Sequence, residues 1–365
     1  MSDAALSLFY SLTVLNPFLS AAEAQRLAPP ALEEAAAIAL RLKMPYLFFA
    51  NIKKLGLEGL LKPDTLVVFK KEEQAAVQRG LYWMGRLRQL AALLKESGID
   101  FVPLKGSSLV TGTYQDPGLR YSLDLDIFID IRQFAACRAV LEKNGFRLAP
   151  LQLKNGVFID KGRECTFAGP DGAEVDVHYR FFQWHIERYV FKVPSADIFA
   201  DRLRGVPWRG MPLDRLRWED EFYYLLLCLA GDHFSEFRYY ADADALVRVH
   251  GDTFDWARVK AHVDRSPVRR LLREAMHFMR TGLGTPIPSD RKEDVGTKAP
   301  APALRGLFQR RFFYFMAAER VYDKIALVAV FTRWKIFSVS GLFRRYFIER
   351  NNPEGELHAV TMEAQ

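Results

Sequence analysis

The stretch from Phe101 to Asp130 constrains the fold of this chain more than any other. It reads FVPLKGSSLVTGTYQDPGLRYSLDLDIFID. Its apolar start predicts a short buried strand that leads into a Lys-Gly-Ser-Ser turn and a short helix. A Pro-Gly sequence with the residues of a type II turn then precedes a second strand, whose alternation places Asp124 and Asp126 on one face. The pattern predicts a compact α+β unit.

Helices are expected on both sides of that unit. Apolar periodicity predicts helices over 31–42 and 69–98 and through most of the chain after Arg217. Strands are predicted at 157–160 and 165–168, paired with each other, and at 174–179. We expect an α+β fold with a small mixed sheet and helices, flanked by helical regions. The predicted parts are an N-terminal helical region (1–95), the core (96–205), a C-terminal helical domain (206–290), a linker (291–303), a basic aromatic helical segment (304–350) and a tail (351–365).

The net charge of +7 is concentrated in one segment. Between Ala301 and Arg350, ten Lys and Arg stand against three Asp and Glu, so this segment accounts for the whole positive excess. Aromatic residues are interleaved with these cations. Three interpretations compete for 305–350: an amphipathic helical pair packed on the domain, a peripheral membrane contact, and a nucleic-acid contact through phosphates and base stacking.

Cysteine spacing and hydropathy favour a cytoplasmic location. The three cysteines, Cys137, Cys165 and Cys228, lie far apart and form no CxxC pair, which suits a reducing compartment. The N-terminus lacks the basic region of a signal peptide, and no uncharged run reaches the roughly 18–20 residues that span a bilayer. Peripheral attachment at the inner membrane surface is the alternative that the basic segment leaves open.

Three carboxylates suggest a metal site. Asp124 and Asp126 are separated by the strand repeat, and Asp176 lies on a later strand, opposite in alternation to Val175 and Val177. Hard oxygen ligands suit Mg²⁺, and two such ions neutralise the charge that develops in nucleotidyl transfer. The sequence therefore predicts metal-dependent nucleotidyl transfer, although a lone DxD motif is a weak signal.

A phosphate cradle is predicted between the first strand and the helix. Gly106 allows close approach of the backbone, and free N–H groups at a helix N-terminus favour anions. Ser107 and Ser108 add hydroxyl groups, while Lys105 and Arg120 supply positive charge for the nucleotide. Each cation is equally well explained as an ordinary surface charge, and Gly-Ser after a strand is often only a turn.

Polar residues outside this motif are better explained by structure than by chemistry. His178 is more often a core residue, or a support for a metal ligand, than a ligand itself. Asp242 and Asp244 lie in a predicted helix, where capping or pairing with arginines is the favoured interpretation over contact with nucleotide or acceptor.

The motifs together resemble a known family. The strings LKGSSL, DPG, DLDIFI and EVDVHYRF are similar to the uncharacterised nucleotidyltransferase family of the DNA polymerase beta superfamily. The resemblance covers roughly 80–290 and extends to His233, Asp242 and Trp256. It implies that Gly106 and Ser107 form the phosphate-binding turn. It also implies that Asp124 and Asp126 form the metal pair, with Asp176 as the third acidic position.

The expected activity is transfer of a nucleoside monophosphate from a nucleoside triphosphate, such as ATP, to a hydroxyl group, with two Mg²⁺ ions and release of pyrophosphate. Asp176 would help to bind the catalytic metal and accept the proton of the attacking hydroxyl. The acceptor remains open between a small molecule, a sugar, a protein side chain and RNA. A toxin-like enzyme that modifies tRNA, and a non-catalytic binding protein of the same fold, are the alternatives.

Overall fold

The computed structural model describes most of the first 288 residues. The described residues are 2–15, 23, 26–114, 116–120, 122–149, 153–154, 157–158, 164–181, 195–231, 236–266 and 269–288. The chain divides into Met1–Pro288 and Ser289–Gln365. The predicted linker, basic segment and tail lie outside the described residues, as does His233, so the interpretations of 305–350 stay predictions. The finer division of the first 288 residues also stays a prediction.

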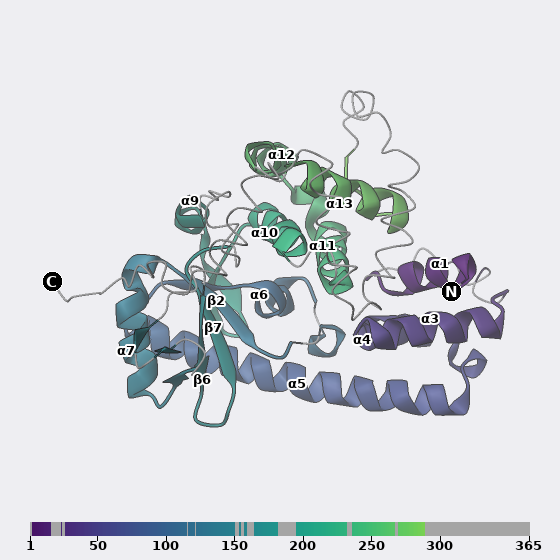
Figure 1. The fold of residues 1–365 in the computed structure, drawn as a ribbon, viewed down its shortest axis with the longest axis horizontal. Coiled ribbons are helices and arrows are strands. Elements are labelled where there is room, and N and C mark those ends of the chain that lie inside the picture. The colour runs from purple at the N-terminus through teal and green to yellow at the C-terminus, as the bar shows by residue number, and fades with distance from the viewer. Residues whose placement is uncertain are drawn as a thin grey trace, which may run out of the picture. The chain divides into compact units, whose positions relative to one another are not determined.

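Helices make up most of the described chain (Figure 1). The α-helices are α1 (Asp3–Leu12), α3 (Pro29–Arg41), α4 (Pro45–Lys54), α5 (Pro63–Glu96), α6 (Lys105–Gly112), α7 (Phe134–Lys143), α9 (Ser195–Ala200), α10 (Trp218–Gly231), α11 (Phe237–His250), α12 (Trp256–Arg265) and α13 (Arg269–Gly282). Short 3-10 helices are η1 (Glu58–Leu60), η2 (Pro117–Leu119), η3 (Ile131–Gln133) and η5 (Gly251–Thr253). The strands are β1 (Phe101–Pro103), β2 (Leu125–Ile129), β3 (Arg147–Leu148), β4 (Leu153–Lys154), β5 (Val157–Phe158), β6 (Glu164–Ala168), β7 (Glu174–His178), β8 (Leu203–Trp208) and β9 (Met211–Arg215).

The structure contains a small mixed sheet, which confirms the predicted α+β class. Its strand order is β1-β2-β7-β6-β3. β2 and β7 are parallel, and the remaining neighbours in this sheet are antiparallel. The predicted pairing of 157–160 with 165–168 is wrong, because β5 pairs with β4 while β6 lies between β7 and β3. The separate β8–β9 hairpin was not predicted.

One face of the sheet is packed against helices. Alternate residues of β2 and β7 join a buried cluster with residues of α5 and α7: Leu125, Ile127, Ile129, Val175, Val177, Leu87, Leu90, Leu94, Phe134, Cys137 and Leu141. The long helix α5 lies along the sheet and continues toward α3 and α4 (Figure 1). Burial of this apolar face fixes which residues of β2 and β7 turn to the opposite face, where the polar residues lie.

The connection between α6 and β2 differs in detail from its prediction. Pro117–Leu119 forms a 3-10 helix, where a type II turn was expected. The Asp116 side chain accepts a hydrogen bond from the Gly118 N–H at 2.7 Å and so caps this helix. η2 packs against α5, and a Cβ atom at Gly118 would lie 2.6 Å from Val77 Cγ2. Close packing against α5 therefore favours glycine at this position.

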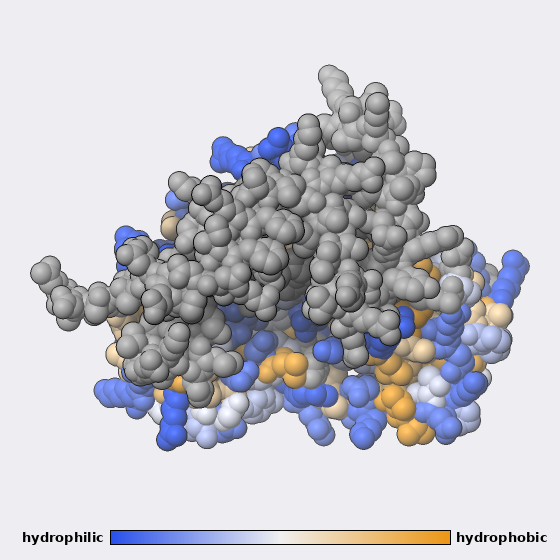
Figure 2. Space-filling view, in the orientation of Figure 1, coloured by the Kyte–Doolittle hydropathy of each residue, from blue (hydrophilic) through white to orange (hydrophobic). Residues whose placement is uncertain are grey.

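Apolar groups are scattered over the described surface. Val67, Val68, Leu81 and Tyr82 of α5 are exposed. Figure 2 shows orange apolar areas interrupted by blue charged ones on the visible described part of the molecule. Such scattered exposure is normal for proteins in water. Among the described helices, none is both long enough and apolar enough to cross a bilayer.

Candidate active site

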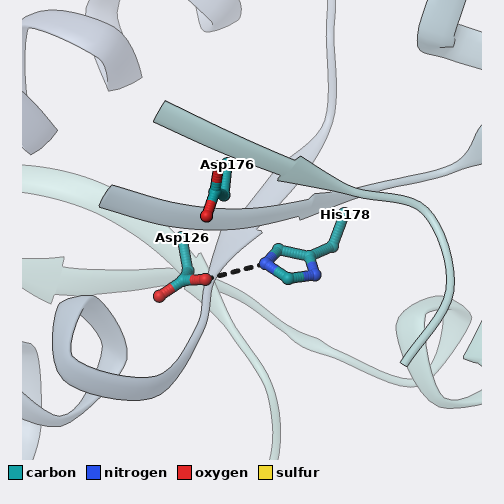
Figure 3. Close-up of side chains that lie close together, drawn as sticks. All are labelled: Asp126, Asp176 and His178. Atoms are coloured by element: carbon teal, nitrogen blue, oxygen red, sulfur yellow. Dashed lines mark hydrogen bonds and ion pairs between the residues drawn. The ribbon is translucent and has the colours of Figure 1, made fainter. Parts of the chain in front are cut away.

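Two neighbouring strands carry acidic residues to one place. The parallel register of β2 and β7 pairs Asp126 with Asp176 and Phe128 with His178. Residues paired in register project to the same face of a sheet. The side chains of Asp126, Asp176 and His178 accordingly lie close together (Figure 3). The structure thus brings together two of the three predicted carboxylates and the predicted histidine.

Two basic side chains bind the Asp126 carboxylate, which is almost fully buried. Its Oδ1 accepts a hydrogen bond from Lys105 Nζ at 2.7 Å and lies 2.7 Å from His178 Nε2. The other ring nitrogen of His178, Nδ1, lies 3.0 Å from Glu164 Oε2 on β6. The contact with His178 Nε2 helps to fix the orientation of the Asp126 carboxylate.

The other two carboxylates have fewer partners. Asp176 Oδ1 accepts a hydrogen bond from Thr166 Oγ1 at 2.6 Å, across the β6–β7 pair. Asp124 lies one residue before β2, and Ser122 Oγ is 2.9 Å from its backbone oxygen and 3.3 Å from its Oδ1. Both carboxylates therefore keep oxygen lone pairs with which to bind a cation.

The three carboxylates differ in their electrostatic surroundings. Burial, together with the charge of Asp126, raises the pKa of Asp124 to about 6 and raises that of Asp176 above its ordinary value. Burial also opposes ionisation of Asp126, but Lys105 and His178 outweigh it and hold the pKa of Asp126 well below its usual range. A bound cation would lower the pKa values of Asp124 and Asp176, because it favours the charged form of a carboxylate.

The predicted phosphate turn lies beside this cluster. Lys105 adopts a left-handed conformation with φ of 51°, which residues other than glycine rarely do. Two contacts hold it there: its Nζ binds Asp126, and its N–H donates to Glu221 Oε1 of α10 at 3.1 Å. Ser107 and Ser108 follow in the first turn of α6 and are buried. The turn is thus anchored to both the sheet and the C-terminal helices.

Gly106 lies in a narrow space. A Cβ atom there would be 3.0 Å from Ser122 Oγ and 3.4 Å from the guanidinium carbon of Arg120. The absence of a side chain lets the turn approach the segment before β2. The assignment of Lys105, Gly106, Ser107 and Ser108 to nucleotide binding stays a prediction.

Arg120 is engaged with the C-terminal helices. It is 4% exposed, and its Nε donates to Asp242 Oδ1 of α11 at 2.7 Å. Tyr114 Oη donates to the same oxygen at 3.1 Å. The predicted pairing of Asp242 with an arginine is therefore confirmed, and Asp244 likewise binds Arg248 at 2.8 Å. The predicted role of Arg120 in nucleotide binding stays untested.

The cluster fits a hard divalent cation. Asp126, Asp176 and His178 each offer a ligand atom, and these atoms lie within 4.8 Å of one another. Asp124 is not part of that group in the described chain, although its charge interacts with those of Asp126 and Asp176. Carboxylate oxygens are the ligands that Mg²⁺ prefers, so the two aspartates suit that ion, while the Nε2 of His178 is already bonded to Asp126.

Some residues of the site were not predicted. Glu164, Thr166 and Glu221 contact His178, Asp176 and Lys105, respectively. The alternation of β6 could have indicated the first two, because Glu164 and Thr166 fall on one face of a strand next to β7. No local pattern marks Glu221, which lies in a predicted helix far along the chain from Lys105.

Comparison with known proteins shows which family the sequence matches. A family model described as an uncharacterised nucleotidyltransferase matches residues 18–284. Among solved structures, one similar chain is from the crystal structure of ANT(2")-Ia in complex with adenylyl-2"-tobramycin. That match has 12% sequence identity and a TM-score of 0.31, and it covers 53% of this chain and 98% of the other. No curated protein matches the chain.

Proposed function

The chain belongs to the family of uncharacterised nucleotidyltransferases, and we propose that it moves a nucleoside monophosphate from a nucleoside triphosphate to a hydroxyl group of an acceptor. The reaction depends on Mg²⁺ and releases pyrophosphate. The observation that carries the proposal is the register match of Asp126 with Asp176, beside a Lys-Gly-Ser-Ser turn that Lys105 ties to Asp126. Family membership supports the general reaction, and the site supports the finer statement.

The carboxylates of Asp124, Asp126 and Asp176 would hold the divalent metal. When bound, Mg²⁺ would neutralise charge on the phosphate oxygens and the leaving pyrophosphate. Lys105 adds positive charge beside Asp126, and His178 with Glu164 keeps the Asp126 carboxylate in place. These contacts prepare the site before substrate binds, which is the main requirement for electrostatic catalysis.

Asp176 is suited to accept the proton of the attacking hydroxyl. Burial and the charge of Asp126 raise its pKa, and a carboxylate with a raised pKa is a stronger base. Thr166 donates to its Oδ1, which leaves the lone pairs of the second oxygen for the proton. The acceptor hydroxyl loses its proton to Asp176 as its oxygen bonds to the α-phosphorus. The bond from the α-phosphorus to the oxygen that bridges to the β-phosphate breaks, and pyrophosphate leaves.

Label transfer tests the proposal directly. Purified protein is incubated with each of the four α-labelled triphosphates, with Mg²⁺ or with EDTA, and with three fractions of a cell extract: small molecules, RNA and proteins. We expect label to enter one fraction, only with Mg²⁺, and not with the Asp126→Asn/Asp176→Asn double variant. If no triphosphate binds and no fraction is labelled, the proposed function is wrong. The labelled fraction identifies the class of acceptor.

A further inference from the structure

Arg238 lies on the same face of α11 as Asp242, the residue that binds Arg120. It belongs to the first turn of the helix, four residues before Asp242, and side chains spaced by four residues lie on one face of a helix. Asp242 binds Arg120, whose guanidinium lies next to Gly106. Arg238 therefore shares a helix face with Asp242, whose partner Arg120 lies next to the phosphate turn.

The guanidinium of Arg238 has at least one N–H donor without an acceptor among the described residues. The carboxylate of Glu236 is 3.9 Å from one terminal nitrogen, which is longer than a hydrogen bond. The Nε of Arg238 is buried and has no hydrogen-bond partner among the described residues. A buried N–H without an acceptor is costly, so an acceptor supplied by a ligand would be favoured there.

Arg238 differs in this respect from the other arginines of the same region. Arg248, also on α11, donates from Nε to Asp244 at 2.8 Å, and Arg258 donates to Asp220 at 2.8 Å. Arg120 donates to Asp242 at 2.7 Å. Short charged hydrogen bonds give Arg120, Arg248 and Arg258 a structural role. The contact of Arg238 with Glu236 is longer than a hydrogen bond, so it does not give Arg238 a comparable structural role.

The charge of Arg238 reaches the acidic cluster. The positive charge of Arg238 interacts favourably with the carboxylate of Asp124. Arg238 is thus close enough to influence a carboxylate of the candidate metal site from the C-terminal helices. Its side chain is 25% exposed, so the guanidinium is accessible to a ligand in solution.

We propose that Arg238 binds the polyphosphate of the nucleoside triphosphate, with its guanidinium donating to phosphate oxygens. The inference rests on the proposed function and adds a substrate-binding residue to it. A planar guanidinium can donate two parallel hydrogen bonds to a phosphate, and such charged pairs are among the strongest hydrogen bonds in proteins. With this residue, α11 contributes directly to the nucleotide site, opposite the turn of α6.

Binding measurements with matched variants test the assignment. The probe is whichever of ATP, CTP, GTP and UTP the wild-type protein binds most tightly with Mg²⁺. We expect Arg238→Gln to weaken binding of that triphosphate roughly ten- to one-hundred-fold, and Arg238→Lys to weaken it less. Affinity for the corresponding nucleoside, which has no phosphate, should stay the same. Equal weakening of nucleoside and triphosphate would overturn the assignment.

Two further variants separate binding from structure. Glu236→Gln removes the carboxylate next to Arg238 and should leave triphosphate affinity unchanged or increase it. Arg132→Gln removes an arginine that is 86% exposed and should change neither affinity nor melting temperature. Triphosphate binding by Arg238→Gln within twofold of wild type would refute the inference while the proposed function stands. A wild-type protein that binds no triphosphate would instead refute the proposed function.

Discussion

Lys105 Nζ and Asp126 Oδ1 form an ion pair at 2.7 Å, in which the two side chains are 13% and 3% exposed. The pair joins the start of α6 to the middle of β2. It therefore fixes the predicted phosphate turn at a constant position relative to the carboxylates. Asp126 is the common partner of the turn, of His178 and of the candidate metal, which makes it the most informative residue to change.

Replacement of Asp126 by Asn should nearly abolish nucleotidyl transfer. The amide keeps the volume of the carboxylate but loses its charge, so it binds both a divalent cation and Lys105 poorly. We expect the initial rate of label transfer to fall by about a thousandfold or more. Asp130→Asn, at the end of the same strand, is the control, because Asp130 pairs only with exposed Arg132 in the described chain and should retain full activity. Retention of a tenth of the activity by Asp126→Asn would contradict the assignment.

The buried pair of Arg120 and Asp242 should contribute strongly to stability. Asp242→Ala leaves a buried guanidinium without its carboxylate, so we expect a loss of about 3–5 kcal/mol in the free energy of unfolding. The double variant Arg120→Met/Asp242→Leu removes both charges and should lose less than Asp242→Ala alone. Urea unfolding measures the free energy of unfolding of both variants.

The control is Arg138→Ala, which breaks an exposed pair with Glu142 on α7 and should cost less than about 0.5 kcal/mol. An equally small cost for Asp242→Ala would show that the pair is not structural.

The sequence predicted the strands of the site because a local pattern specifies them. Alternation of apolar and polar residues in β2 and β7 identifies both the strands and the faces on which Asp126 and Asp176 lie. The hydrogen-bond partner of Arg120 could not be predicted in this way. Its partner, Asp242, belongs to a helix far along the chain, and no periodic pattern specifies which charges meet across such a distance.

Strand pairing was predicted less well than strand position. Residues 157–158 form a strand as expected, but their partner is β4 and not β6. Short strands carry too few side chains to fix a register, so the nearest candidate along the sequence is an unreliable partner. The β8–β9 hairpin was overlooked because Pro207 and Pro212, which face each other in it, are residues that normally argue against a strand.

Glu221 should make stability depend on pH. Burial raises its pKa to about 8 from an ordinary value of 4.5, although the Ser108 side chain and the Lys105 N–H oppose the rise. Between these values the folded protein keeps a proton that the unfolded chain has lost. The stabilisation from Glu221 is therefore complete below about pH 4.5 and is lost as the pH rises to about 8.

Unfolding in urea between pH 5 and pH 8 measures this effect. The decrease in unfolding free energy with pH should be shallower in Glu221→Gln, by up to about 1.4 kcal/mol per pH unit, because glutamine cannot lose a proton. Glutamine can also still accept the Lys105 N–H. Glu142→Gln on the exposed side of α7 should leave the slope unchanged. Identical slopes for wild type and Glu221→Gln would mean that Glu221 is ionised in the folded protein.

Gly112 should tolerate no larger residue, because α6 meets α10 there. A Cβ atom at Gly112 would lie 2.6 Å from Cη2 of Trp218. The indole cannot move aside easily, since it stacks on His250 at 4.0 Å and Arg215 lies 3.7 Å from its ring centre. We expect Gly112→Ala to cost about 1–3 kcal/mol of unfolding free energy.

Gly85→Ala is the matched control. This glycine also lies in a helix, and a Cβ there would meet nothing within 4 Å, so alanine should stabilise the protein by about 0.5–1 kcal/mol. Thermal unfolding of both variants tests the contrast, and a stable Gly112→Ala protein would show that α6 and α10 are not held together at this point.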